Sequence, residues 1–106
     1  MAIYAAMRVM KLILARDGSE QDATIIFSER ECELLEQLQP TLEGRTEKQK
    51  NKFPKGKLSW AAWIIGRLGG WKGYAKESPP GPITMYYGME MFQKMYDGWN
   101  LAKMCG

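Results

Sequence analysis

The segment from residue 82 to about residue 104 carries two apolar stripes on one expected helix, and this feature limits the possible folds more than any other. Pro82 suits the first turn of a helix, because an amide hydrogen has no helical partner there. Downstream, apolar residues recur at spacings of three and four, which places each series on one helical face. One series is Met85, Met89, Phe92, Tyr96 and Trp99, and the other is Tyr87, Met91, Met95, Gly98 and Ala102.

A helix in a small domain usually needs one apolar face for its own core, so the second stripe needs a separate explanation. One alternative is a central helix that the rest of its own chain surrounds. The other is a partner molecule, and Gly98 and Ala102 favour it, because two small residues four positions apart let helix backbones approach closely. A crossing of this helix with its own copy is self-complementary about a two-fold axis.

Three shorter helices are expected upstream, at residues 3–16, 28–40 and 58–68, each with apolar residues at helical spacing. Ser28 and Glu31 match a capping box, Pro40 is expected to limit the second helix, and Gly69-Gly70 to stop the third. Residues 24–27 are expected to be an extended lead-in packed on the core. The apolar series are Ile3, Met7, Met10 and Leu14, then Cys32, Leu35 and Leu38, and finally Trp60, Trp63, Ile64 and Leu68.

The pattern predicts one all-α domain over residues 1–106, a small bundle of about four helices with a long C-terminal helix and two irregular loops. The first loop, 43–57, is basic, whereas residues 29–36 are acidic, and such a separation can steer a polyanion to one surface. Two ordinary solvated stretches would show the same pattern, so both interpretations stay open. The basic residues of the loop are Arg45, Lys48, Lys50, Lys52, Lys55 and Lys57.

The second loop, 71–81, combines positive charge with aromatic rings. Lys72, Tyr74 and Lys76 follow Trp71 among glycines and prolines. This arrangement suits contact with a phosphate backbone, and the absence of a base-reading motif favours positioning over sequence recognition. The alternative is a loop whose two rings pack inward while the lysines are merely solvated.

The sequence contains no set of residues that indicates catalysis or a metal site. It has no histidine, which removes the common general base and the Ser-His and Cys-His pairs. Cys32 and Cys105 are too few for a structural zinc site and fit a reduced, cytoplasmic compartment. Glu90 and Asp97 share a side of the last helix but are expected to form a solvated edge. No apolar run reaches the roughly 20 residues of a membrane span. We therefore expect no enzyme activity, no cofactor and no membrane partner for this chain.

Four short elements between residues 58 and 99 carry a family resemblance. They are Leu58-Ser59-Trp60-Ala61, Gly66-Arg67-Leu68-Gly69-Gly70-Trp71, Pro79-Pro80-Gly81-Pro82 and Tyr96-Asp97-Gly98-Trp99. These elements resemble the C-terminal dimerisation region of bacterial insertion-sequence transposases of the Tn-five type. Residues 27–35 resemble the helix that opens that region, and the first helix and the basic loop have counterparts in order, so the resemblance covers essentially the whole chain.

The resemblance implies an all-helical domain that follows an RNase H-like catalytic core, whose Mg²⁺ or Mn²⁺ ions drive DNA strand transfer. The Tyr-Arg-Glu-Lys-type signature of that core is not found here, so we expect a fragment or truncated product that does not cleave DNA by itself. In this family the last helix pairs with its copy, and the loop before it touches terminal DNA. Lys76 is the nearest match for that DNA contact, and Lys72 is almost as good. The implied pairing residues are Lys94, Met95, Gly98, Trp99 and Ala102.

The leading expectation is a homodimerisation domain in the bacterial cytoplasm that aligns two catalytic domains on transposon-end DNA. The alternative is a stand-alone nucleic-acid-binding protein that uses the basic loop at 45–57. The expected dimer interface is Tyr87, Met91, Lys94, Met95, Gly98, Trp99 and Ala102. The expected DNA-backbone contacts are Lys72, Lys76, Lys48, Lys50, Lys52 and Lys55.

Overall fold

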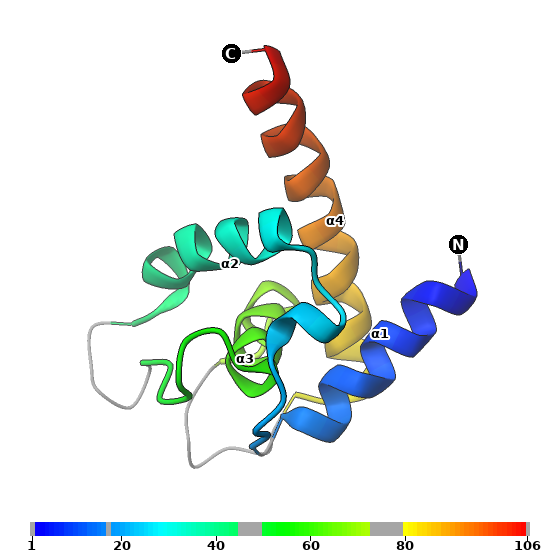
Figure 1. The fold of residues 1–106 in the computed structure, drawn as a ribbon. Coiled ribbons are helices and arrows are strands. Elements are labelled where there is room, and N and C mark those ends of the chain that lie inside the picture. Colours follow the sequence, from blue (N-terminus) through cyan, green and yellow to red (C-terminus); the bar gives the residue numbers. More distant parts are fainter. Residues whose placement is uncertain (1, 17, 45–49, 73–79, 106) are drawn as a thin grey trace.

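The computed structural model describes residues 2–16, 18–44, 50–72 and 80–105, and these form helices joined by irregular segments (Figure 1). In chain order the elements are α1 (Ala2–Ala15), the 3₁₀ helix η1 (Ala23–Ile25), α2 (Glu29–Leu42), α3 (Leu58–Leu68) and α4 (Pro82–Cys105). Within the described ranges there is no strand, and an isolated antiparallel bridge joins Asp22 to Lys57. The expected all-α bundle with a long C-terminal helix is confirmed.

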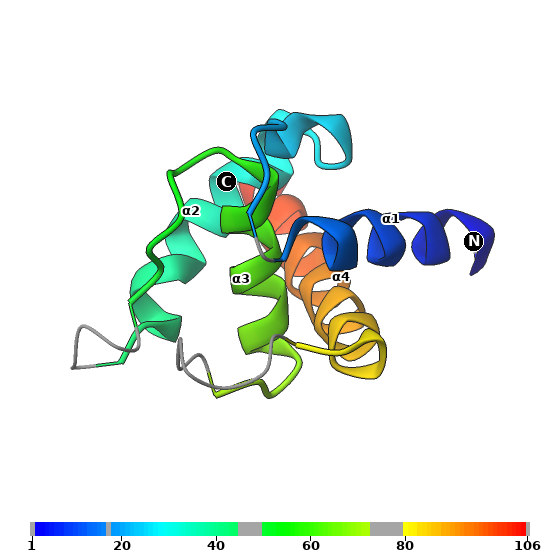
Figure 2. The ribbon, with the colours of Figure 1, turned by 90° about the horizontal axis from the view of Figure 1, so that it is seen from below.

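The helix α3 lies at the centre of the fold. All of its residues from 58 to 66 are buried, as expected for a helix that is apolar around its whole circumference. The helices α1, α2 and α4 and the 3₁₀ helix η1 all contact it. Figure 2 shows α2 on one side of α3, with α1 and α4 on the other. The predicted bounds of α3 agree with the structure, and Gly70 after it has a φ of 101°, which is the left-handed conformation that ends helices.

The helices α3 and α4 approach closely because Gly88 of α4 and Gly69, the residue that follows α3, both lie at the contact. A Cβ on Gly88 would lie 1.9 Å from the carbonyl oxygen of Ile65. A Cβ on Gly69 would lie 1.9 Å from the carbonyl oxygen of Thr84. Any side chain at either position would force the helices apart, so these two glycines set the depth at which α4 sits against the core.

Three of the four residues of the apolar series predicted on α1 do not lie on the core face of that helix, and the side chain of the fourth, Ile3, lies outside the described part of the structure. Met7, Met10 and Leu14 are 53%, 63% and 81% exposed. Because α1 is apolar around most of its circumference, helical spacing does not select the side that is buried. That side is selected by packing against α4 and α3. Among the side chains of α1 that the structure describes, those on the buried side are Arg8, Val9, Leu12 and Ala15.

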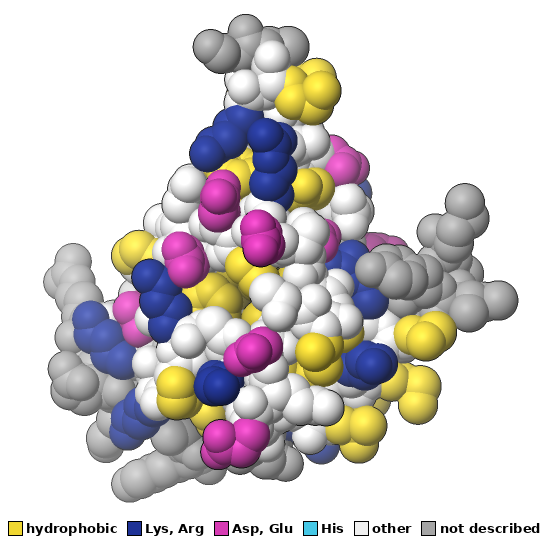
Figure 3. All heavy atoms as spheres, in the orientation of Figure 1, with side chains coloured by type: hydrophobic (Ala, Val, Ile, Leu, Met, Phe, Trp, Pro, Cys, Tyr) yellow, Lys and Arg dark blue, Asp and Glu magenta, His cyan; other side chains and the backbone are white. Residues whose placement is uncertain are grey.

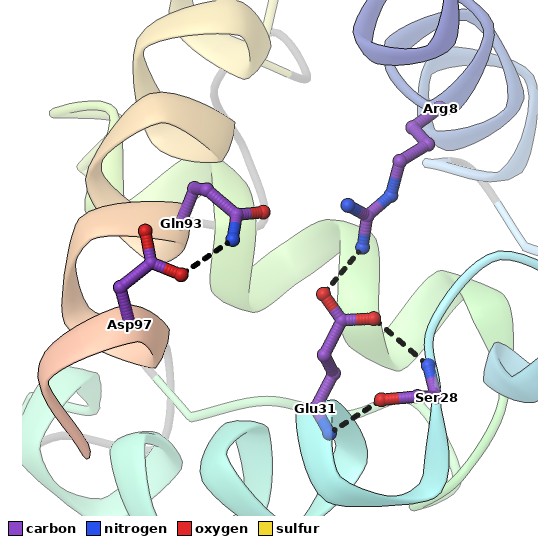
Figure 4. Close-up of polar contacts among 5 residues, drawn as sticks. All are labelled: Arg8, Ser28, Glu31, Gln93 and Asp97. Carbon is purple, nitrogen blue, oxygen red and sulfur yellow. Dashed lines mark hydrogen bonds and ion pairs between the residues drawn. The ribbon is translucent and has the colours of Figure 1, made fainter. Parts of the chain in front are cut away.

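Arg8 and Glu31 join α1 to α2 through a buried ion pair. The Arg8 Nη2 atom donates to Glu31 Oε2 at 3.0 Å, and the two side chains are 7% and 12% exposed (Figure 4). Glu31 Oε1 accepts from the Ser28 amide at 2.9 Å, and Ser28 Oγ accepts from the Glu31 amide at 3.1 Å. The predicted capping box is therefore confirmed, and its glutamate also anchors α1.

Two boundary predictions were wrong. Pro40 does not limit α2, which continues to Leu42 with the proline inside it. The proline stands in the last turn, so its missing amide removes a single bond near the helix end, and the Glu43 amide still donates to the Gln39 carbonyl at 3.1 Å. The segment expected to be extended forms η1 instead, and the buried Phe27 follows it.

Candidate functional site

The two stripes of α4 differ in burial. Met85, Met89 and Phe92 of the first stripe are buried in the core, and Tyr96 and Trp99 are half-buried against it, as expected for the face that meets α3 and α1. In the second stripe Tyr87, Met91 and Met95 are 58%, 47% and 39% exposed, and Gly98 and Ala102 are exposed as well. The described parts of the chain thus leave this stripe uncovered. Its C-terminal half lies on a portion of α4 that projects beyond the other helices (Figure 1).

Gly98 and Gly88 occupy opposite situations on the same helix. The Cβ position of Gly88 is filled by the backbone of α3, whereas nothing in the described structure lies within 4 Å of a Cβ built at Gly98. Gly98 therefore has no packing role that the described residues reveal. Together with Ala102, four positions later, it leaves a shallow strip of backbone open to a close approach.

Trp99 lies apart from the uncovered stripe. Its Nε1 donates to Gln37 Oε1 of α2 at 3.3 Å, and its ring centroid is 6.0 Å from that of Tyr96. The Lys103 ammonium lies 4.6 Å from the Trp99 ring and 3.8 Å from a carboxylate oxygen of Glu33. These contacts hold α4 against α2, so Trp99 joins the two helices within one chain, whereas Tyr87 and Met91 face solvent.

Charged residues border the stripe on α4. Lys94, which the family resemblance places at the interface, is exposed, as are Glu90 and Asp97. Asp97 Oδ1 accepts from Gln93 Nε2 at 3.0 Å (Figure 4). Across the described residues, no three histidine, cysteine, aspartate or glutamate side chains group closely enough to hold a metal ion. The two carboxylates of α4 form a solvated edge.

The basic residues of the first loop fall into two groups. Lys55 and Lys57 lie 3.6 Å and 3.3 Å from carboxylate oxygens of Glu36 and Asp22. Lys50 and Lys52, and Lys72 of the second loop, have no carboxylate within salt-bridge distance among the described residues. The expected contacts Lys48 and Lys76 lie outside the described residues. In Figure 3 carboxylates form a row over α2, with basic side chains beyond its left-hand end.

A polar network holds the first basic loop against the core. The Asn51 amide donates to Glu43 Oε2 at 2.7 Å, and the Asn51 side chain donates to the Trp60 carbonyl at 3.2 Å. Gln39 donates to the same Glu43 oxygen at 3.3 Å and accepts from Trp60 Nε1 at 2.8 Å. Lys50 and Lys52, on either side of Asn51, are thereby fixed beside α3 and the end of α2. Sequence reasoning missed this network, because no local motif marks it.

Cys32 lies half-buried on α2. Burial raises the pKa of its thiol, and the nearby carboxylates of Glu31, Glu36 and Glu29 raise the pKa further. The thiolate is the reactive form of cysteine, so this environment keeps Cys32 protonated and weakly nucleophilic at neutral pH.

The described residues form a small all-α domain with exposed apolar side chains on α4 and on α1 and with lysines in the first loop that have no described carboxylate partner. No protein-family model matches the chain, nor does any curated protein or solved structure. None of the described helices is long and apolar enough to cross a membrane.

Proposed function

We propose that this chain is a homodimerisation domain, and specifically the C-terminal domain of a cut-and-paste transposase of the Tn-five type. In this role it aligns two catalytic domains in the complex that joins two transposon ends. Catalysis then belongs to a separate metal-dependent core of the parent protein, using Mg²⁺ or Mn²⁺, and this domain supplies contacts. The observation that carries the proposal is the exposed stripe of Tyr87, Met91 and Met95 beside the open Gly98.

The physical case for self-association rests on area and on close approach. Large apolar side chains repeated along an exposed helix gain about 25 cal/mol for each Å² that a partner covers. A copy of the same helix crossing at Gly98 and Ala102 covers the exposed stripe of each molecule at once, because a two-fold interface uses the same patch twice. A stable interface buries roughly 800 Å² per partner, so the flanking Lys94 and neighbouring residues also take part.

Auxiliary contact with the DNA backbone completes the proposed role. Lys50, Lys52 and Lys72 have no described carboxylate partner, so their charge is available to phosphates. The same observation favours a second candidate function, a stand-alone nucleic-acid-binding protein that uses loop 45–57 as its main site. The two functions predict different results. A stand-alone nucleic-acid-binding protein binds DNA as a monomer, whereas a dimerisation domain forms a dimer without DNA.

A matched pair of tyrosines tests the dimer. Tyr87 lies on the stripe, and its neighbour Tyr86, 46% exposed, points about 100° away around the helix. We expect the unmodified chain to be a dimer by size-exclusion chromatography with light scattering, and Tyr87→Asp and Ala102→Asp to be monomers. Tyr86→Asp is the control and should remain a dimer. A monomeric unmodified chain at high concentration, or equal loss in both tyrosine variants, contradicts the proposal.

A further inference from the structure

Arg67 connects the two basic loops of the chain. It lies in the last turn of α3, where it is the single charged residue of that helix. Its Nε donates to the carbonyl oxygen of Leu42 at 2.9 Å, and its Nη1 donates to the carbonyl oxygen of Trp71 at 2.7 Å. Leu42 is the last residue of α2 and leads into the first loop, whereas Trp71 directly precedes Lys72. One guanidinium thus holds the beginnings of both loops together.

The charge of Arg67 adds to that of the lysines. Both acceptors are neutral carbonyl groups, and among the described residues no carboxylate lies within salt-bridge distance of Arg67. The Leu42 carbonyl belongs to the C-terminal end of α2, where a cation is favourable. The Glu43–Asn51 hydrogen bond places Lys50 and Lys52 beside the same helix end. Lys50, Lys52 and Lys72 therefore all follow segments that are held near the C-terminal end of α2.

We propose that Arg67 is a positioning residue that combines Lys50, Lys52 and Lys72 into one surface for the phosphate backbone of duplex DNA. This inference rests on the proposed function, in which the basic loops contact DNA. It adds that the two loops act as a single surface, and it assigns the residue that makes them one. Phosphates need cations at defined positions, and the planar fork of arginine is suited to fixing two backbone oxygens at once.

The orientation of Trp71 favours duplex over single-stranded DNA. Its amide donates to the Gly66 carbonyl at 3.0 Å, and its ring meets Trp63 edge to face at a centroid distance of 6.3 Å. The ring is thus engaged with α3, in agreement with the inward-packing alternative for this residue. Proteins that bind single strands present aromatic rings on which bases stack, and Trp71 does not serve that purpose here. The proposed surface therefore contacts DNA through its positively charged side chains and the phosphates of the backbone.

The test measures fluorescence anisotropy of a labelled random-sequence DNA duplex of about 20 base pairs over a range of salt concentrations. Lys52→Ala and Lys72→Ala should each reduce the slope of log affinity against log salt by about one, and the double variant by about two. Lys11→Ala removes an exposed cation of α1 and is the control, which should bind as the unmodified chain does. A single strand of the same length should bind more weakly than the duplex.

Arg67→Lys separates positioning from charge, because lysine keeps the charge and lacks the fork. We expect Arg67→Lys to weaken binding about 3- to 10-fold, and Lys72→Ala to cause no further loss in that background. Wild-type affinity in Arg67→Lys, or a full loss of affinity from Lys72→Ala in the Arg67→Lys background, overturns the positioning role.

If Arg67→Lys does not fold, the lysine variants still test whether the two loops form one surface. A change in the salt dependence of binding in only one of Lys52→Ala and Lys72→Ala overturns that claim. Failure to bind the duplex overturns the inference as well. Light scattering reports the dimer separately, so a lost dimer and a lost DNA surface are distinguishable.

Discussion

At the scale of single residues, the described structure relies on a few polar side chains that each perform two tasks. Glu31 caps α2 and pairs with Arg8, and the Arg8 guanidinium also lies 4.8 Å from the centre of the Phe27 ring. Removing one partner of a buried ion pair leaves the other charge in a poor environment, which costs much more than the pair itself contributes. Such residues therefore fix how α1 sits on the core.

The roles of Glu31 can be separated by substitution. Arg8→Ala should lower the free energy of unfolding by about 3–5 kcal/mol, because it leaves a buried carboxylate without its cation. Ser28→Ala should cost about 1 kcal/mol, since it removes the cap alone. Urea denaturation monitored by circular dichroism measures both. Similar small losses in the two variants would contradict the anchoring role of Arg8.

At the scale of elements, α4 has two faces of similar composition, of which one is buried and the other is exposed. Both carry bulky apolar residues and a glycine. The face with Gly88 lies against the α3 backbone, and the face with Gly98 is open. Helical periodicity places residues on a face, but the neighbouring helix determines which face is filled.

Alanine at the two glycines of α4 should have opposite effects. Gly88→Ala should destabilise the fold by about 1–3 kcal/mol or more, because the added carbon collides with the Ile65 carbonyl. Gly98→Ala should stabilise the monomer by up to about 1 kcal/mol through helix propensity. It should also weaken the proposed dimer, since the added methyl group separates the crossing helices. Thermal unfolding at low protein concentration, compared with light scattering, checks both effects. A stabilised Gly88→Ala variant would show that the helix contact is looser than the structure indicates.

At the scale of the whole molecule, the described residues share one core. The radius of gyration of 13.0 Å is close to the roughly 13 Å expected for a compact domain of about 100 residues. The C-terminal part of α4, which extends beyond the other helices, is the exception to this compact shape (Figure 1). The dimer proposed above would cover it and would thereby link folding to association.

This linkage makes stability depend on concentration. For the unmodified chain we expect the thermal midpoint to rise as protein concentration increases, because a partner that binds the folded state stabilises it by mass action. The midpoint of Tyr87→Asp should not change with concentration. Differential scanning calorimetry over a range of concentrations measures this, and a constant midpoint for the unmodified chain would argue against the proposed dimer.

Much of the local structure follows from the sequence because it depends on near neighbours. The capping box joins residues three apart, the bounds of α3 follow from an apolar run ended by glycines, and the two stripes of α4 follow from helical spacing. The prediction failed at Pro40, where a proline in the last turn removes a single helical bond, and at residues 24 and 25, which belong to a 3₁₀ helix. The candidate interface was found from spacing, and the basic loops were found from composition.

The sequence by itself determined that the chain is helical and that α4 carries two apolar faces, because periodicity is a short-range property. The tertiary structure decided which of those faces is buried and that α1 turns Met7, Met10 and Leu14 outward. It also revealed that Arg67 reaches two loops. Those outcomes depend on contacts between residues far apart in the chain, such as Arg8 with Glu31 and Arg67 with Leu42, which are separated by 23 and 25 positions. Such contacts form only when helices pack, and no local pattern encodes them.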